Sequence, residues 1–282
     1  MPLTTLKEIL TSAEKGNYAV GMFDVVGTES LKAIIQAAEE CNAPVIIALA
    51  EVHMPYAPLN LIAPLMVNAA RQAKVPVAVH LDHGISYDVI IKTMALGFTS
   101  VMHDGSTLSY EENLKNTAEI TRAAKALGIS VEAELGHVGG EEGGGEDNYE
   151  AFYTDPALAS DFVEKTGVDA LAVAIGTVHG EYIKKPALDL NRLSEIHKNV
   201  SVPLVLHGGS GLSDDDFRNC IRGGIRKINI FTDMSYAASE GIKKLFEEKK
   251  KPHCYDISEA AEKSMRKVVM EKICLFGSNL KA

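Results

Sequence analysis

Short apolar runs rich in β-branched residues alternate with helical segments about eight times along the chain. Because these runs are apolar on both faces and are separated by helices, they indicate a parallel sheet that is covered on both sides. Eight such units without a linker predict an α/β fold, a closed (β/α)8 TIM barrel that forms a single domain over residues 1–282. An open, doubly wound sheet is the alternative architecture. The predicted strands cover residues 18–23, 45–49, 77–81, 99–102, 129–132, 170–174, 203–206 and 227–230.

Two additional helices are expected outside the eightfold pattern, one at each end of the chain. Residues 1–16 have the spacing of an amphipathic helix and lack the apolar block of a signal peptide. The stretch from Asp256 onward has a periodic apolar face, which predicts a helix that packs outside the barrel or joins subunits. No apolar run is long enough to cross a bilayer, so we expect a cytoplasmic protein with no membrane partner.

The net charge limits the kinds of binding partner that we expect, and the cysteine content limits the expected disulfide bonding. The net charge is −10, from 28 basic and 38 acidic residues, and the sequence has no basic stripe of the kind that binds nucleic acid. An anionic substrate would therefore be held by local groups rather than by the overall field of the protein. The four cysteines form no CxxC pair, which favours reduced thiols over a disulfide framework.

Three histidines share one local context: His83, His179 and His207 each end an apolar strand-like run and are followed directly by glycine. One histidine in such a position is usually a hydrogen-bonded polar residue, but the repetition favours a shared role. Three imidazoles that leave one coordination position for water or substrate form a catalytic zinc site rather than a structural one. Their spacing is too long for a zinc finger, so the fold would have to assemble the site. His80 lies inside a predicted strand and is expected to bind a polar neighbour instead of metal.

The position of the polar residues predicts one active site. In a TIM barrel the active site lies at the carboxyl ends of the strands. The polar candidates that lie at the ends of predicted strands or in the loops after them are Asp82, His83, Asp104, Glu134, His179, His207 and Asn229. All of them should therefore meet on the same rim of the barrel.

The loops after the seventh and eighth predicted strands have the composition of a phosphate site. HGGSG, residues 207–211, offers backbone N–H groups that can approach a ligand closely, because its glycines carry no side chain. NIFTD, residues 229–233, adds Asn229, Thr232 and further backbone donors. TIM barrels usually bind phosphate at these two loops, so we expect a phosphorylated substrate.

Residues 136–148, GHVGGEEGGGEDN, break the alternation of strands and helices. Glycine and acidic residues dominate this stretch, and nothing in it can pack a core. The composition is compatible both with an exposed disordered insert and with a functional lid. Its position on the rim that carries the histidines favours a mobile lid over the active site.

In combination, HLDHG, VEAELG, AIGTVHG, VLHGGSG and INIFTD resemble the class II, zinc-dependent ketose-bisphosphate aldolases. The resemblance runs from Leu6 to Gly277 and is closest to the branch that contains tagatose- and fructose-bisphosphate aldolases. It implies a (β/α)8 barrel and an aldehyde-lyase of carbohydrate metabolism such as glycolysis. It also implies a small-molecule sugar phosphate as substrate and a homodimer or homotetramer as the assembly.

The same resemblance implies a metal site. His83, His179 and His207 would bind the catalytic zinc. Asp104 and Glu134 would belong to a secondary metal position and to the surroundings of the zinc. Zinc would draw electron density from the C2 ketone and stabilise the enediolate that is left when C3–C4 breaks, so no lysine Schiff base is required.

The resemblance also implies catalytic and substrate-binding residues. Asp82 would be the acid/base at the C4 oxygen, and Glu142 would exchange the proton at the nucleophilic carbon. A monovalent cation, Na+ or K+, would lie near Gly180 and Gly208 and help to neutralise the phosphate. The residues implied for the dihydroxyacetone phosphate site are Gly180, Gly208, Gly209, Ser210, Asn229, Ile230, Phe231 and Thr232.

The chain departs from these relatives at the end that would hold the aldehyde half. Asp24 stands where relatives commonly have Asn, and Ala50, followed by Glu51, stands where they commonly have Ser or Thr. An added carboxylate and a lost hydroxyl are both unfavourable for a distal phosphate. Asp24 and Ala50 are therefore candidates for contact with the tail of the substrate.

These departures leave the substrate open. The first choice is a ketose 1,6-bisphosphate of fructose or tagatose type, with a basic residue such as Arg266 compensating at the distal phosphate. The alternative is a ketose 1-phosphate with a deoxy, hydroxyl or sulfonate tail, such as sulfofructose 1-phosphate. From another functional class, a non-catalytic partner subunit of an aldolase would be expected to lose Asp82 or a zinc ligand, and both are present.

Overall fold

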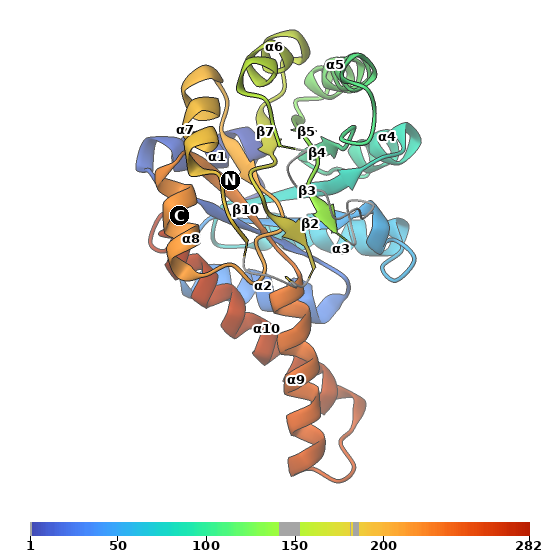
Figure 1. Ribbon diagram of the computed structural model, residues 1–282. Helices are drawn as coiled ribbons and strands as arrows, with labels where there is room; N and C mark the ends of the chain where they lie inside the picture. The colour runs from blue at the N-terminus through green and yellow to red at the C-terminus, as the bar shows by residue number, and fades with distance from the viewer. Residues whose placement is uncertain (1, 141–152, 181, 183–185) are drawn as a thin grey trace.

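The structure, a computed structural model, describes residues 2–140, 153–180, 182 and 186–282. Within these residues, eight parallel strands close into a barrel in the order β1-β10-β9-β7-β5-β4-β3-β2 (Figure 1). The closed barrel confirms the predicted fold class and excludes the open sheet. The barrel strands are β1 (Val20–Asp24), β2 (Val45–Ala50), β3 (Val77–Gly84), β4 (Ser100–His103), β5 (Ser130–Leu135), β7 (Ala170–Val173), β9 (Leu204–Leu206) and β10 (Ile225–Ile230).

Helices surround the barrel, and a short pair of strands, β6 (Gly139–Gly140) and β8 (Val178–His179), lies at its mouth. The helices are α1 (Leu6–Gly16), α2 (Thr28–Glu40), the 3-10 helix η1 (Glu51–His53), α3 (Leu59–Gln72), α4 (Tyr87–Ala95), α5 (Tyr110–Ala126), α6 (Pro156–Thr166), α7 (Leu190–Asn199), α8 (Asp214–Arg222), α9 (Thr232–Glu248) and α10 (Cys254–Phe276). Among the described residues, no helix is both long enough and apolar enough to cross a membrane.

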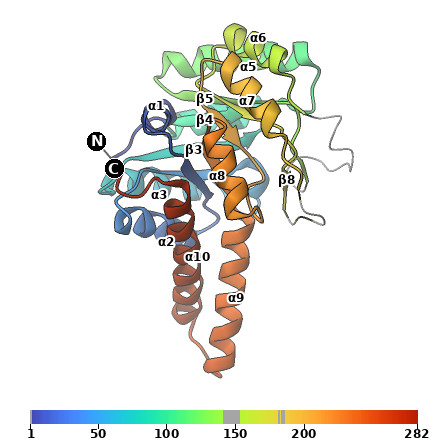
Figure 2. The same ribbon diagram turned by 60° about the vertical axis from the view of Figure 1, so that its left-hand side comes forward.

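The two helices expected outside the eightfold pattern are α1 and α10. Thr5 and Glu8 form a capping box that begins α1, and Asn17 ends the helix in a left-handed conformation. The apolar face of α10 includes Met265, Val269 and Ile273 and packs against α2 and β1. Beyond the barrel, α9 and α10 run side by side as a projecting arm (Figures 1 and 2).

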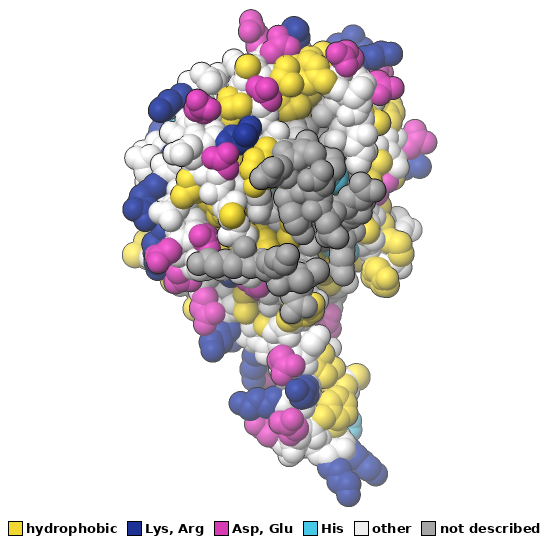
Figure 3. Space-filling model, viewed as in Figure 1, with side chains coloured by type: hydrophobic (Ala, Val, Ile, Leu, Met, Phe, Trp, Pro, Cys, Tyr) yellow, Lys and Arg dark blue, Asp and Glu magenta, His cyan; other side chains and the backbone are white. Residues whose placement is uncertain are grey.

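Basic side chains gather at the free end of this arm, and over the rest of the visible face they alternate with acidic ones (Figure 3). The arm ends in the exposed residues Lys249, Lys250 and Lys251, which follow α9 directly. The three lysines therefore lie in solvent at the end of α9.

The apolar residues form two layers, one between the strands and the helices and one inside the barrel. The inner layer comprises Val20, Met22, Ile46, Ala48, Ala78, Met102, Ala170, Ala172 and Val205, packed against Leu6, Ile9 and Leu10 of α1. Because α1 lies at the start of β3 and β5, it closes the amino-terminal end of the barrel. The opposite, carboxyl-terminal end is where the inward-facing residues become polar.

Candidate metal centre and active site

The end of β3 brings two consecutive residues into the barrel mouth. Neighbouring residues of a regular strand point to opposite faces, so Asp82 and His83 would normally diverge. The pairing of β3 with β4 shifts between Leu81 and Gly84, and His83 has a left-handed backbone with φ of 42°. Both side chains are buried, and Nε2 of His83 lies 3.8 Å from Oδ2 of Asp82. The irregular strand end therefore sets a candidate ligand beside a candidate acid/base.

The three histidines predicted as zinc ligands converge from β3, β8 and the end of β9. Nε2 of His83 lies 3.1 Å from Nε2 of His179 and 2.8 Å from Nδ1 of His207. Zinc–nitrogen bonds of about 2.0–2.1 Å at tetrahedral angles separate the nitrogens by about 3.3 Å. The donor set and its spacing therefore fit a zinc ion bound by three imidazoles.

Two of these histidines are held by carboxylates on their second nitrogen. Nδ1 of His83 lies 2.7 Å from Oδ2 of Asp104, and Nε2 of His207 lies 2.9 Å from Oε1 of Glu132. Such a carboxylate fixes the tautomer and the orientation of a metal-ligating histidine. Glu132 is absent from the sequence-based candidates because it lies inside a strand. The signal that could have found it is its position two residues before Glu134, on the same face of β5.

Burial and nearby charge decide which imidazole carries a proton. Burial disfavours the charged form of His83, but the carboxylates around it, Asp82 foremost, outweigh burial and raise the pKa of His83 well above its usual value. Burial and the positive charge of His83 lower the pKa of His179 and of His207. Because metal binds the deprotonated imidazole, zinc would displace the proton of His83.

A second group of potential ligands joins His83, Asp104 and Glu134. Oε1 of Glu134 accepts from the backbone N–H of Val138 over 3.0 Å, whereas Oε2 is buried without a hydrogen-bond partner among the described residues. Burial, followed by the charge of Asp104, raises the pKa of Glu134 to about 8. A second cation at this position would satisfy that oxygen, and this agrees with the implied secondary metal position.

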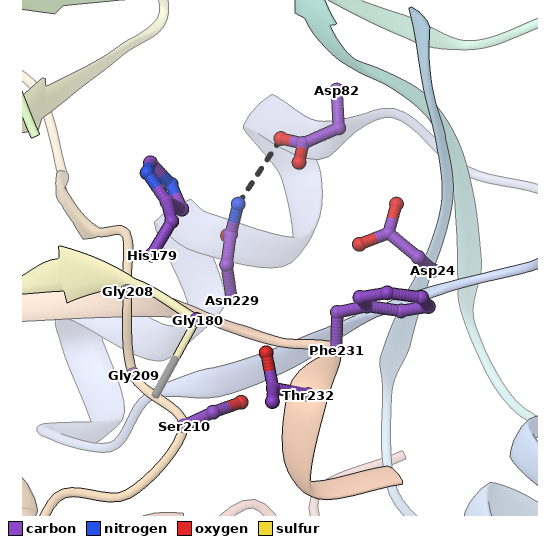
Figure 4. A pocket seen from close by; sticks show the side chains of 10 residues that line it. All are labelled: Asp24, Asp82, His179, Gly180, Gly208, Gly209, Ser210, Asn229, Phe231 and Thr232. Atoms are coloured by element: carbon purple, nitrogen blue, oxygen red, sulfur yellow. Dashed lines mark hydrogen bonds between the residues drawn. The ribbon is translucent and has the colours of Figure 1, made fainter. Parts of the chain in front are cut away.

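A small cavity opens beside His179 (Figure 4). Nδ2 of Asn229 donates to Oδ1 of Asp82 over 3.0 Å on one side of the cavity, and Ser210 and Thr232 lie on the other (Figure 4). Asp82 and most of the predicted substrate-binding residues thus line the same cavity. The lining residues are Asp24, Asp82, His179, Gly180, Gly208, Gly209, Ser210, Asn229, Phe231 and Thr232.

The loop after β9 approaches β8 so closely that Gly208 has no room for a side chain. Gly208 has a φ of 64°, and a Cβ there would lie 2.3 Å from the backbone oxygen of Val178. The hydroxyl of Tyr182 donates to the backbone oxygen of Gly208 over 2.7 Å. The loop that carries Ser210 is thereby fixed against the strand that carries His179.

Three described residues that were expected to contact the substrate do not line the cavity. Ile230 packs in the outer apolar layer, because it follows the inward-facing Asn229 and so points outward. Ala50 is fully buried in β2 beside Asp82. Arg266 lies on α10 and donates to Glu40 on α2 over 2.9 Å, outside the barrel, so its expected role at a distal phosphate is wrong.

The loop predicted over residues 136–148 is described as far as Gly140, which pairs with His179, and Glu142 lies outside the described residues. His80 binds a polar neighbour as expected, with Nδ1 2.8 Å from the hydroxyl oxygen of Ser100.

A carboxylate lies at the end of the cavity nearest β1. Asp24 is buried and points into the cavity beside Phe231 (Figure 4). The ring of His53 lies 4.3 Å from that of Phe231, and burial lowers the pKa of His53. Glu51 turns away and accepts from two backbone N–H groups in the loop before α4. Among the described lining residues there is no lysine or arginine.

The barrel and the histidine-rich site at its carboxyl end define a metal-binding TIM-barrel enzyme. The family model described as fructose-bisphosphate aldolase class-II matches residues 4–281. The chain therefore belongs to the class II fructose-bisphosphate aldolase family, and it is an aldolase, a carbon–carbon lyase. Members of this family are zinc-dependent, which agrees with the donor set at the rim.

Relatives of known sequence or structure match the chain over almost its full length. The uncharacterized protein YdjI of Escherichia coli K12 is 42% identical over 270 residues, which cover 96% of each chain. The crystal structure of the YdjI aldolase from the same organism superposes with a TM-score of 0.90 at 38% identity, over 99% of each chain. A fructose-bisphosphate aldolase from Campylobacter jejuni has a TM-score of 0.84 at 24% identity, covers 99% of this chain and 97% of its own, and shows the shared fold.

Proposed function

We propose that this aldolase cleaves a ketose phosphate reversibly, in a zinc-dependent reaction, to dihydroxyacetone phosphate and an aldehyde. The observation that carries the proposal is the convergence of three imidazole nitrogens beside Asp82, next to a cavity that Asp82, His179 and the glycine-rich loop after β9 line. A zinc hydrolase would have no need of two phosphate-binding loops, and a metal-dependent isomerase usually places more carboxylates around its metal.

The zinc would be held by Nε2 of His83, Nε2 of His179 and Nδ1 of His207. Bound there, it would supply a Lewis acid for the C2 ketone and for the negative charge left when C3–C4 breaks. Asp104 and Glu132 would keep His83 and His207 oriented for this task, as their contacts of 2.7 and 2.9 Å support.

Asp82 would remove the proton of the C4 hydroxyl as the aldehyde departs. The side-chain amide of Asn229 donates to Oδ1 of Asp82, which leaves Oδ2 as the oxygen for proton transfer. The proton at C3 would be returned by Glu142, as the resemblance to the family implies.

The phosphate of dihydroxyacetone phosphate would lie against Gly180, the loop after β9 and the start of α9. Backbone N–H groups, the hydroxyls of Ser210 and Thr232, and the amino end of a helix are suitable partners for a phosphate. A monovalent cation near Gly180 and Gly208 is a further part of this proposal.

A second candidate concerns the tail of the sugar. A ketose 1,6-bisphosphate of fructose or tagatose type is the family substrate, but Asp24 would face the far end of that sugar. A buried carboxylate repels a phosphate dianion and accepts hydrogen bonds from hydroxyls. This observation favours a ketose 1-phosphate with a hydroxyl or deoxy tail; a sulfonate tail, being anionic, is disfavoured by the same carboxylate.

A panel of sugars tests both the proposed aldol cleavage and the proposed tail of the substrate. We expect dihydroxyacetone phosphate to be released from at least one of fructose 1,6-bisphosphate, tagatose 1,6-bisphosphate and the corresponding 1-phosphates. Asp24→Asn should improve kcat/KM for the bisphosphates relative to the 1-phosphates, because it removes the repelling charge. Unchanged relative rates in the Asp24→Asn variant would refute the tail assignment without affecting the aldolase proposal.

A further inference from the structure

A buried ion pair lies directly behind one of the zinc ligands. Nζ of Lys227 is 3.0 Å from both carboxylate oxygens of Glu132, and both side chains are fully buried. Lys227 is on β10 and Glu132 is on β5, and these strands are not neighbours in the barrel. Their side chains therefore meet across the barrel interior, where TIM barrels usually place apolar residues.

The ion pair continues into the metal site. Oε1 of Glu132, which Lys227 contacts, is also the oxygen that lies 2.9 Å from Nε2 of His207. The other ring nitrogen of His207, Nδ1, faces His83. Nε2 must then carry the hydrogen that Glu132 accepts, so that Nδ1 presents a lone pair to a metal.

Other groups around Glu132 are less suited to hold it. Nε2 of His80 is 3.7 Å from Oε2 of Glu132, beyond hydrogen-bond length, and burial lowers the pKa of His80 so that it is neutral. Asp82 carries the same charge as Glu132 and lies 4.0 Å from Nζ of Lys227. Lys227 is thus the cation that fixes Glu132 among the described residues.

We propose that Lys227 is a positioning residue for the zinc site: it holds Glu132 where that carboxylate orients His207 with Nδ1 toward the metal. The proposal rests on the proposed function only in that the three histidines bind zinc. A buried ion pair contributes little to stability compared with apolar packing, so stability alone gives no reason for this pair at the base of the site. Removing a partner behind a metal-bound histidine typically weakens metal binding by about 10- to 100-fold.

The test is the zinc affinity of the folded protein, measured by competition with a chelating dye, together with the visible spectrum of the cobalt-substituted protein. Lys227→Met should weaken zinc binding by about 10- to 100-fold and alter the cobalt spectrum, because His207 is no longer held in one orientation. Arg226→Met is the matched control. Arg226 directly precedes Lys227 on β10, is buried, and pairs with Glu14 outside the site over 3.0 Å. This control should lose stability and keep the wild-type zinc affinity.

The double variant Lys227→Met/Glu132→Gln separates positioning from folding. The amide oxygen of the glutamine can still accept from Nε2 of His207, and no unpaired charge is left in the barrel. We expect it to bind zinc more tightly than Lys227→Met and no more weakly than Glu132→Gln. If Lys227→Met does not fold, the zinc affinity of the double variant compared with that of Glu132→Gln tests the proposal.

Two results would overturn the proposal. One is a folded Lys227→Met protein with wild-type zinc affinity and cobalt spectrum, and the other is a double variant that binds zinc at least about tenfold more weakly than Glu132→Gln. Failure of the wild-type protein itself to bind zinc would instead refute the proposed function.

Discussion

At the scale of the residue, the site depends on an irregular backbone at the end of β3, which no pattern in the sequence predicts. Asp82 and His83 are adjacent, yet the left-handed backbone of His83 lets both side chains lie at the mouth of the barrel, 3.8 Å apart. The convergence of His83, His179 and His207 could be predicted, because each ends an apolar strand-like run and precedes a glycine. Glu132 could have been found only through the alternation that places it on the same face as Glu134, and Lys227 has no such neighbour to show which face it occupies.

Asp82→Asn tests the acid/base assignment. The asparagine keeps an oxygen for the hydrogen bond from Asn229 but cannot accept a proton, so kcat should fall by about 10²- to 10⁴-fold. Zinc content, measured by atomic absorption, should stay at the wild-type level. His207→Ala is the comparison, and it should lose both zinc and cleavage. A near-native rate in Asp82→Asn would contradict the assignment.

The pH dependence of zinc binding tests the electrostatics of His83. Burial opposes the proton on His83 but the surrounding carboxylates raise its pKa, and zinc must displace that proton. Below the pKa of His83, the apparent zinc affinity should therefore rise with pH by up to about tenfold per unit. Because this pKa is raised, the rise should continue above about pH 6.5, the usual histidine value, before it levels off.

Asp104→Asn is the matched variant for this titration. It removes the carboxylate that is hydrogen-bonded to Nδ1 of His83, so the affinity should level off at a lower pH. A competition titration from about pH 6 to about pH 9 measures both curves. An affinity that is independent of pH over this range would contradict the charged state assigned to His83.

At the scale of the element, most of the fold follows from periodicity. Each of the eight predicted strands overlaps a strand of the barrel, and the helices expected at both ends are α1 and α10. What periodicity could not supply is the inward or outward direction of single residues at strand ends. The resemblance to the family implies a substrate-binding role for Ile230, yet the alternation along β10 turns its side chain into the outer apolar layer.

Gly208→Ala tests how closely the phosphate loop must approach β8. Gly208 and Gly128 both have positive φ, 64° and 71°, so an alanine at either should cost about 1–2 kcal/mol of stability. Only at Gly208 would the added Cβ meet a backbone oxygen, at 2.3 Å, whereas at Gly128 nothing lies within 4 Å.

We therefore expect Gly208→Ala to raise KM for the sugar phosphate by at least about tenfold and Gly128→Ala to leave KM unchanged. Steady-state kinetics and thermal denaturation of the two variants measure the two effects separately. Equal KM values would mean that the loop tolerates displacement from β8.

At the scale of the whole molecule, the metal should link the strands that carry its ligands. His83, His179 and His207 come from widely separated parts of the sequence, so zinc bound by all three would favour the closed barrel over the unfolded chain. At a free zinc concentration 100 times the dissociation constant, the free energy of unfolding should increase by about 2.7 kcal/mol. Calorimetry with and without chelator measures this, and His207→Ala should show no such gain.

The cytoplasmic location and the homo-oligomeric state stay predictions. Projecting helices such as α9 and α10 are suited to contact a second subunit, and the apolar face of α10 is already occupied by packing against α2 and β1. Sedimentation analysis of the intact protein would give the number of subunits.

The central claim is that zinc held by three histidines drives aldol cleavage, and a zinc titration of the metal-stripped protein tests it most directly. With a cleavable sugar from the panel, the release of dihydroxyacetone phosphate should rise linearly with added zinc and level off near one equivalent per chain. Cleavage that persists in the stripped protein, or zinc that binds in full without releasing dihydroxyacetone phosphate from any sugar of the panel, would contradict the account.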